Sequence, residues 1–138
     1  MAVNRFNSNF GKREFANILN SSVQPQNLQR RLLEPGHGVV ELGTVLTSDA
    51  AGVYRPMADT DTEVRAVLWE LEPVDTDSPD ANLNVVVAMD GDYNQNALED
   101  IMGFVFTVDM IDAAERLKIF IGRQAKYNFA DPMAYLAQ

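Results

Sequence analysis

The chain has 138 residues, of which 46% are hydrophobic, and its net charge is −9. This length fits one domain, and the hydrophobic fraction is enough for a core, which excludes wholesale disorder. The absence of cysteine excludes disulfides and thiolate metal sites. No apolar run approaches the roughly 20 residues of a membrane span, and the N-terminus lacks the apolar stretch of a secretory signal. We therefore expect a protein that is made and acts in soluble form, with no membrane partner.

The charge is divided unevenly along the chain. Residues 1–38 carry five basic and two acidic side chains, a net charge of +3, whereas residues 39–138 carry six basic and eighteen acidic side chains, a net charge of −12. An acidic body repels nucleic acid, so we expect no nucleic-acid partner. The basic N-terminal segment could contact an acidic surface or simply be solvated, and its composition leaves both interpretations open.

Residues 1–38 are predicted to form an extended N-terminal arm. Asn and Gln are frequent there, the apolar residues are widely spaced, and Pro25 stops any longer helix. A turn at residues 34–38, which contains two glycines and a proline, is a natural boundary. We expect the arm to bind a partner surface through these apolar and basic side chains: Phe6, Phe10, Lys12, Arg13, Phe15, Ile18, Leu19, Arg30 and Arg31.

The remaining chain is predicted to form a body over residues 39–122, followed by a tail over residues 123–138 that packs on the body or extends from it. The body should be α+β and mainly β, a small barrel-like or sandwich-like structure with one or two short helices. The apolar runs predict strands over residues 39–46, 53–56, 64–71, 83–89 and 104–108.

Several local features sharpen this prediction. The run over residues 64–71 is apolar on both faces, which indicates a central strand with Trp69 in the core. Gly43 interrupts the first run and suggests a bulge or close packing. Asp109 is a plausible helix N-cap for a helix through about Leu117. Residues 118–121 could continue that helix or return as a strand.

The sequence contains no recognisable catalytic set. The single histidine, His37, lies between two glycines in a turn, and no Gly-x-Ser-x-Gly motif is present. Residues 90–96 match the first three ligand positions of an EF-hand calcium loop, but Gln95 and Ile101 replace the required Gly and Glu. A turn between strands is the favoured interpretation. We therefore expect neither an enzyme nor a metal or cofactor site.

The order of several short motifs resembles the lambda-like head decoration proteins of tailed bacteriophages. The resemblance rests on a Gly-x-Val-Leu strand, a Gly-x-Tyr-x-Pro turn, two Ala/Val-rich strands and a late helix, and it covers about residues 36–122. These motifs are Gly43-Thr44-Val45-Leu46, Gly52-Val53-Tyr54-Arg55-Pro56, Val64-Arg65-Ala66-Val67-Leu68, Asn84-Val85-Val86-Val87-Ala88 with Tyr93, Asn94 and Leu98, and Ile111-Asp112-Ala113-Ala114-Glu115-Arg116-Leu117.

This resemblance implies a structural role. It predicts a cementing protein on the outer surface of the virion head, made in the host cytoplasm, with the arm lying along the major capsid protein and the body forming a homotrimer at threefold or quasi-threefold sites. Residues 118–121 depart from the family's Leu-Gly-Ile after the late helix. Two other classes of function stay open as alternatives: a small β-barrel module that binds a ligand or carbohydrate, and an enzyme that uses loop carboxylates.

Overall fold

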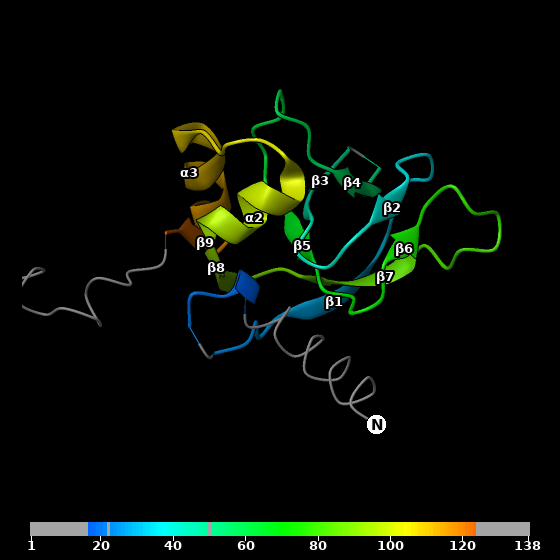
Figure 1. Ribbon diagram of the computed structural model, residues 1–138, viewed down its shortest axis with the longest axis horizontal. Coiled ribbons are helices and arrows are strands. Elements are labelled where there is room, and N and C mark those ends of the chain that lie inside the picture. Colours follow the sequence, from blue (N-terminus) through cyan, green and yellow to red (C-terminus); the bar gives the residue numbers. More distant parts are fainter. Residues whose placement is uncertain (1–16, 22, 50, 124–138) are drawn as a thin grey trace, which may run out of the picture.

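The computed structural model describes residues 17–21, 23–49 and 51–123, which form a mainly β, α+β fold (Figure 1). At its centre lies a five-stranded antiparallel sheet in the order β1-β7-β5-β3-β4. These strands are β1 (Leu28–Leu32), β7 (Asn84–Ala88), β5 (Ala66–Leu68), β3 (Val45–Ser48) and β4 (Tyr54–Pro56). The predicted fold class is confirmed, and across the described residues the sheet stays open rather than closing into a barrel.

Apolar side chains cover both faces of this sheet. In the central strand β5, Val67 belongs to one hydrophobic core, whereas Ala66 and Leu68 belong to a second core on the opposite face. The alternation continues on β7, where Ala88 lies in the first core and Val87 in the second. All five side chains are fully buried. The predicted two-sided burial of the central strands is therefore confirmed.

Two helices cover the first core. α2 (Gln95–Met102) contributes Leu98 and α3 (Val108–Arg116) contributes Met110, both fully buried. The helices join β8 (Gly91–Asn94) to β9 (Ile119–Gly122), which pair in parallel, and parallel neighbours require such a crossover connection. Within the described residues, no helix is long and apolar enough to cross a membrane.

The ends of α3 differ from two expectations. The strand predicted over residues 104–108 is absent: residues 104–107 form the loop into α3 and Val108 is the first residue of the helix, because the Thr107 side chain accepts a hydrogen bond from the Met110 N–H and caps it. Asp109 therefore lies in the first turn rather than at the cap. After the helix, the segment left undecided by the sequence returns as β9, which β8 stabilises through parallel pairing.

The second core lies where the sheet curls. Leu33, which follows β1, forms an isolated parallel bridge to Tyr54 at the start of β4, and the Glu34 N–H donates to the Tyr54 carbonyl at 2.7 Å. The two edge strands thereby meet at one end. A two-stranded ribbon of β2 (Val39–Val40) and β6 (Val74–Asp75) contributes the buried Val40 to the same core.

Gly43 separates β2 from β3, so the predicted strand over residues 39–46 is in fact two strands in different sheets. Gly43 has a φ of +90°, which turns the chain. A Cβ at this position would lie 2.7 Å from Ile101 Cδ1 and 3.3 Å from Ile18 Cγ2. The close packing suggested by the sequence is therefore confirmed.

The predicted boundary at residue 38 is wrong, because the body begins well before it. Ile18 and Leu19 are each only 4% exposed and belong to the first core, and Leu33 is buried in the second core. Between them, β1 forms five register pairs with β7. Ile18 and Leu19 consequently cannot anchor on a partner, and a truncation of residues 1–33 would remove a strand of the sheet.

Glu99 holds the loop between the two helices. Its Oε2 accepts hydrogen bonds from Gln95 Nε2 and from the Phe106 N–H, both at 2.9 Å, and Arg123 Nη2 lies 3.6 Å from Oε1. Burial raises the pKa of Glu99, but these hydrogen bonds and Arg123 outweigh burial, so the pKa falls below its usual value. The carboxylate form is the one that the fold stabilises.

The burial of Leu19 gives a direct test of the corrected boundary. Leu19→Ala should lower the free energy of unfolding by about 2–5 kcal/mol, because it leaves a cavity in the first core. Leu28→Ala, a change of the same chemistry on an exposed side chain, should cost less than about 0.5 kcal/mol. Denaturant unfolding of the two variants measures both values, and equal midpoints would place residue 19 outside the core.

The lowered pKa of Glu99 predicts a pH-dependent contribution to stability. Because the folded-state pKa is depressed, this stabilisation is fully present above the usual pKa of 4.5 and is lost as the pH falls through the lower folded value. Glu99→Gln should therefore destabilise the protein by about 1 kcal/mol at pH 7, and the difference should shrink as the pH falls below 4.5. Denaturant unfolding at several pH values checks this, and a pH-independent difference would contradict it.

Candidate protein-binding surface

Asn20 attaches the N-terminal segment to the body. Its Nδ2 donates to the carbonyls of Tyr93 at 2.8 Å and Gly122 at 2.9 Å, and lies 3.3 Å from Asp92 Oδ1. The Asn20 N–H also donates to the Asp92 carbonyl at 2.9 Å. Together with the buried Leu19, which bridges to Tyr93, these bonds fix residues 19 and 20 beside both strands of the β8–β9 pair. The chain that precedes residue 17 therefore departs from this place.

Asp90 positions the start of β1. Its carboxylate accepts hydrogen bonds from the backbone N–H groups of Gln26 and Asn27, at 3.0 Å each to Oδ1. The carboxylate is thus engaged as a backbone cap rather than as a metal ligand. The predicted turn between strands over residues 90–96 is wrong, because residues 91–94 form β8 and α2 begins at Gln95. Among the described residues, no group of three or more His, Asp or Glu side chains could hold a metal ion.

β1 is an edge strand with one side unpaired over most of its length. At the two ends of its ladder with β7, the Asn27 carbonyl accepts from the Met89 N–H and the Leu33 N–H donates to the Leu83 carbonyl, both at 2.8 Å. In an antiparallel pair, hydrogen-bonded residues alternate. The odd-numbered residues of β1 therefore bond to β7, and the backbone groups of Leu28, Arg30 and Leu32 point away from it.

The side chains of these same three residues lie together on one face of β1. Leu28 and Leu32 are 47% and 52% exposed, and the exposed Arg30 lies between them. The neighbouring Arg31 turns toward the strand, with Nη1 donating to the Arg30 carbonyl at 2.8 Å and Nη2 contacting Gln29 Oε1. We call Leu28, Arg30, Arg31 and Leu32 the β1 edge.

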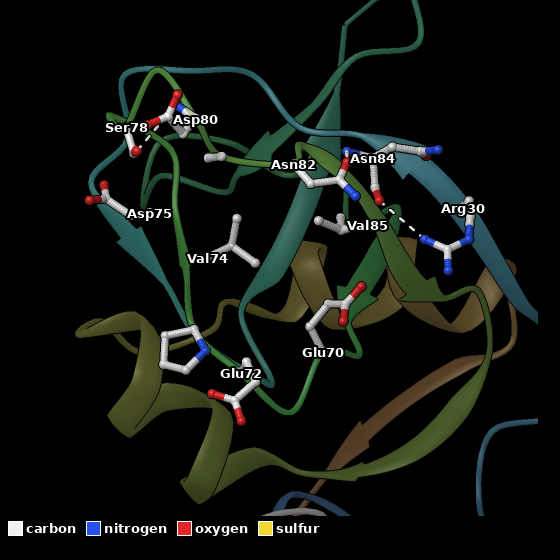
Figure 2. Close-up of a pocket in the computed structure, with 12 residues that line it drawn as sticks. Arg30, Glu70, Glu72, Val74, Asp75, Ser78, Asp80, Asn82, Asn84 and Val85 are labelled. Carbon is white, nitrogen blue, oxygen red and sulfur yellow. Dashed lines mark hydrogen bonds between the residues drawn. The ribbon is translucent and has the colours of Figure 1, made fainter.

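Arg30 also lines a shallow hollow of about 480 Å³ (Figure 2). Figure 2 shows Arg30 on one side, where Nη1 donates to the Asn84 carbonyl, and Asp75 on the opposite side. The lining also includes Glu70, whose carboxylate accepts from the Val86 N–H at 2.7 Å. No aromatic side chain is among the lining residues. The hollow is therefore polar and offers no stacking platform.

Other exposed apolar side chains lie outside the five-stranded sheet. Val105 in the loop before α3 and Val108 at the first position of α3 are 69% and 72% exposed, and Phe120 on β9 is 46% exposed. They belong to the helical side of the molecule, which Figure 1 shows away from β1. Such exposed apolar residues are candidates for contacts with a partner or another copy.

The structure divides the predicted arm residues into three groups. Phe6, Phe10, Lys12, Arg13 and Phe15 lie outside the described residues, as does the predicted tail from residue 124 onward. Ile18 and Leu19 are core residues of the body. Only Arg30 and Arg31 are exposed or half-buried on a surface that a partner can reach.

Sequence reasoning missed the strand that presents these arginines, and it missed Leu28 and Leu32 beside them. Residues 28–32, Leu-Gln-Arg-Arg-Leu, have an arginine at the central position where a strand with one apolar face would have an apolar residue. The segment therefore carries no clear alternation that could have served as a signal.

The attachment at Asn20 can be tested with a change that removes its donor. Asn20→Asp places a carboxylate against two carbonyls and Asp92, so the free energy of unfolding at pH 7 should fall by about 2 kcal/mol. Asn82→Asp introduces the same charge at an exposed position where only the side-chain acceptor is used, and it should change stability by less than about 0.5 kcal/mol. Similar urea midpoints for both variants would show that the Asn20 bonds do not secure the segment.

Comparison with protein-family models, with curated protein sequences and with solved structures found no match to this chain. A proposal for its function therefore has to rest on the order of its sequence motifs and on the chemistry of its described surface. The features that bear on it are the β1 edge and the attachment point of the N-terminal segment.

Proposed function

We propose that this chain is a structural protein that decorates the outside of an icosahedral phage head and stabilises the expanded shell. In this proposal it binds the major capsid protein through its N-terminal segment and the β1 edge, and its body assembles as a homotrimer at threefold or quasi-threefold sites. The observation that carries the proposal is the exposed β1 edge next to a basic N-terminal segment, on a body that is otherwise strongly acidic.

The attachment geometry supports a binding role for the residues before 17. Ile18, Leu19 and Asn20 hold the chain firmly to the β8–β9 pair. A segment that is attached at one defined point can bind a neighbouring subunit while the body keeps its position. Phe6, Phe10 and Phe15 would supply apolar contacts, worth about 1.5–3 kcal/mol each when buried, and Lys12 and Arg13 would meet acidic groups on the capsid.

The exposed apolar residues on the helical side support self-association. Val105, Val108 and Phe120 expose large apolar area on an acidic molecule. Covering such area on the shell would offset the mutual repulsion of bodies that each carry a large negative charge. A threefold site requires heterologous contacts that close into a ring, and these side chains lie on a different part of the fold from the β1 edge.

For the alternative function, a module that binds a small ligand or carbohydrate, the hollow beside Arg30 is a candidate site in the described part of the chain. Its lining is polar and includes Glu70, Glu72, Asp75 and Asp80, without an aromatic side chain. Sugar-binding sites commonly stack an aromatic ring on the sugar, and small-molecule sites are mostly apolar. The hollow therefore supports this alternative less well than the exposed edge supports binding of a protein.

The proposal predicts that the protein binds shells and protects them. Purified expanded shells that lack this protein should co-sediment with it and should withstand heating to a higher temperature afterwards, because a ligand that binds only the intact shell stabilises it by mass action. Deletion of residues 1–16 should abolish co-sedimentation while the unfolding midpoint of the body stays unchanged.

Each outcome tests a different part of the proposal. Shells that melt at the same temperature with and without bound protein would contradict the stabilising function. If the truncated chain binds with unchanged occupancy, residues 1–16 do not carry the binding. The unfolding midpoint of the truncated chain is the control for loss of structure.

A further inference from the structure

The β1 edge has the hydrogen-bonding geometry of a strand that can accept another strand. The N–H and C=O groups of Leu28, Arg30 and Leu32 point away from β7, and β7 is the strand that β1 pairs with in the described part of the chain. At the next position of the same parity, Glu34, the outward N–H already bonds to Tyr54 of β4. The outward side of β1 is therefore able to pair, and β4 uses it where it comes within reach. The Arg30 carbonyl accepts from Arg31 Nη1 at 2.8 Å, and an added strand would replace this side-chain hydrogen bond with a backbone one.

This edge has only one of the protections that proteins usually give to an exposed strand. Edge strands are commonly protected by proline, by bulges or by charged side chains. β1 has no proline and pairs in continuous register with β7 from Leu28 to Leu32, so its protection consists of the charges of Arg30 and Arg31. Of the three side chains on its outward positions, two are half-exposed leucines. A segment of opposite charge turns this protection into an attraction, and such an edge can then bind it by strand addition.

The charge of the edge indicates which segment it accepts. Arg30 and Arg31 are adjacent on a chain whose net charge is −9. Among the described residues neither forms an ion pair, since the four salt bridges involve His37, Arg55, Arg65 and Arg123 instead. Opposite charges directly across a strand pair stabilise it, and like charges destabilise it. An acidic side chain opposite Arg30 is thus favoured.

The same rule disfavours two other occupants. A second copy that paired its own β1 symmetrically about Arg30 would place two arginines opposite each other. Residues 1–16 of this chain hold three basic side chains and one acidic side chain, so they have the wrong sign as well. A partner with an acidic extended segment can pair with the outward backbone groups of β1 and place an opposite charge at Arg30.

We propose that the β1 edge binds an extended segment of a partner protein by strand addition, and that this segment has the pattern apolar-x-acidic-x-apolar. The acidic residue lies opposite Arg30, and the apolar residues lie opposite Leu28 and Leu32. The inference rests on the proposed function in so far as a capsid subunit would supply the segment. The edge itself can be tested without any shell.

The test uses two synthetic peptides, acetyl-Thr-Val-Thr-Glu-Thr-Val-Thr-amide and the same peptide with Lys in place of Glu. Each is titrated into the isotope-labelled full-length protein, and the backbone amide signals of Leu28, Arg30 and Leu32 are followed by NMR. The Glu peptide should shift these signals and bind about tenfold more tightly than the Lys peptide, because the central charge pair changes from attractive to repulsive.

Three variants separate the contribution of backbone pairing to peptide binding from the contribution of charge. Leu32→Pro removes an outward N–H that β7 does not use, so the body should stay folded while peptide binding is lost. Arg30→Glu leaves the backbone unchanged and should reverse the preference toward the Lys peptide. Arg116→Glu makes the same charge change at an exposed position on α3 and should leave the preference for the Glu peptide in place.

The inference is overturned if neither peptide shifts the β1 signals, or if Arg30→Glu keeps the wild-type preference. It is also overturned if the free protein forms a dimer that Leu32→Pro abolishes, since a second copy would then occupy the edge. Shell co-sedimentation distinguishes this failure from that of the proposed function. If Arg30→Glu and Leu32→Pro bind shells as well as the wild type does, strand addition at the β1 edge is refuted and the proposed function is not. If shells bind no wild-type protein, the proposed function is refuted, and the peptide titration still tests strand addition at the β1 edge.

Discussion

The fold depends on a sheet whose central strands are apolar on both faces. Ala66, Val67 and Leu68 have no exposed area, so neither face of β5 can be left to water. Burial of a side chain of the size of Val67 or Leu68 contributes roughly 1.5–3 kcal/mol relative to exposure. A chain of 138 residues must therefore provide two covering layers for a sheet of five short strands.

The two layers are made in different ways. On one face, α2 and α3 provide Leu98 and Met110, and the N-terminal residues Ile18 and Leu19 complete the core. On the other face no helix of the described part of the chain contributes to the core, and the sheet curls on itself until Leu33 bridges to Tyr54. Both covering layers include residues that precede the turn at 34–38. This is the physical reason that the N-terminal region belongs to the body.

The same constraint determines what remains available for binding. Because β1 is recruited to extend the sheet, its outward backbone groups and the side chains of Leu28, Arg30 and Leu32 lie beyond the reach of either layer. The acidic side chains, in contrast, gather in turns and along the hollow, where some serve as backbone caps, as Asp90 does for Gln26 and Asn27. Arg30 borders the hollow whose lining includes four of these acidic side chains, and among the described residues it forms an ion pair with none of them.

The sequence by itself determined the mainly β character, the central strands, the burial of Trp69, the close packing at Gly43 and the existence of a helix after Thr107. These features follow from local signals, namely two-sided apolar runs and a residue that turns the chain. The tertiary structure decided that residues 28–32 form a strand, that the apolar run at 104–108 is a loop leading into the first residue of α3, and that residues 119–122 pair with β8 rather than continue α3. The residues of the candidate surface were found only in part, because Arg30 and Arg31 could be identified from charge but Leu28 and Leu32 could not. The reason is that β1 and β9 are stabilised by partners about 60 and 30 residues away along the chain, and no local pattern encodes a strand whose hydrogen bonds come from so distant a segment.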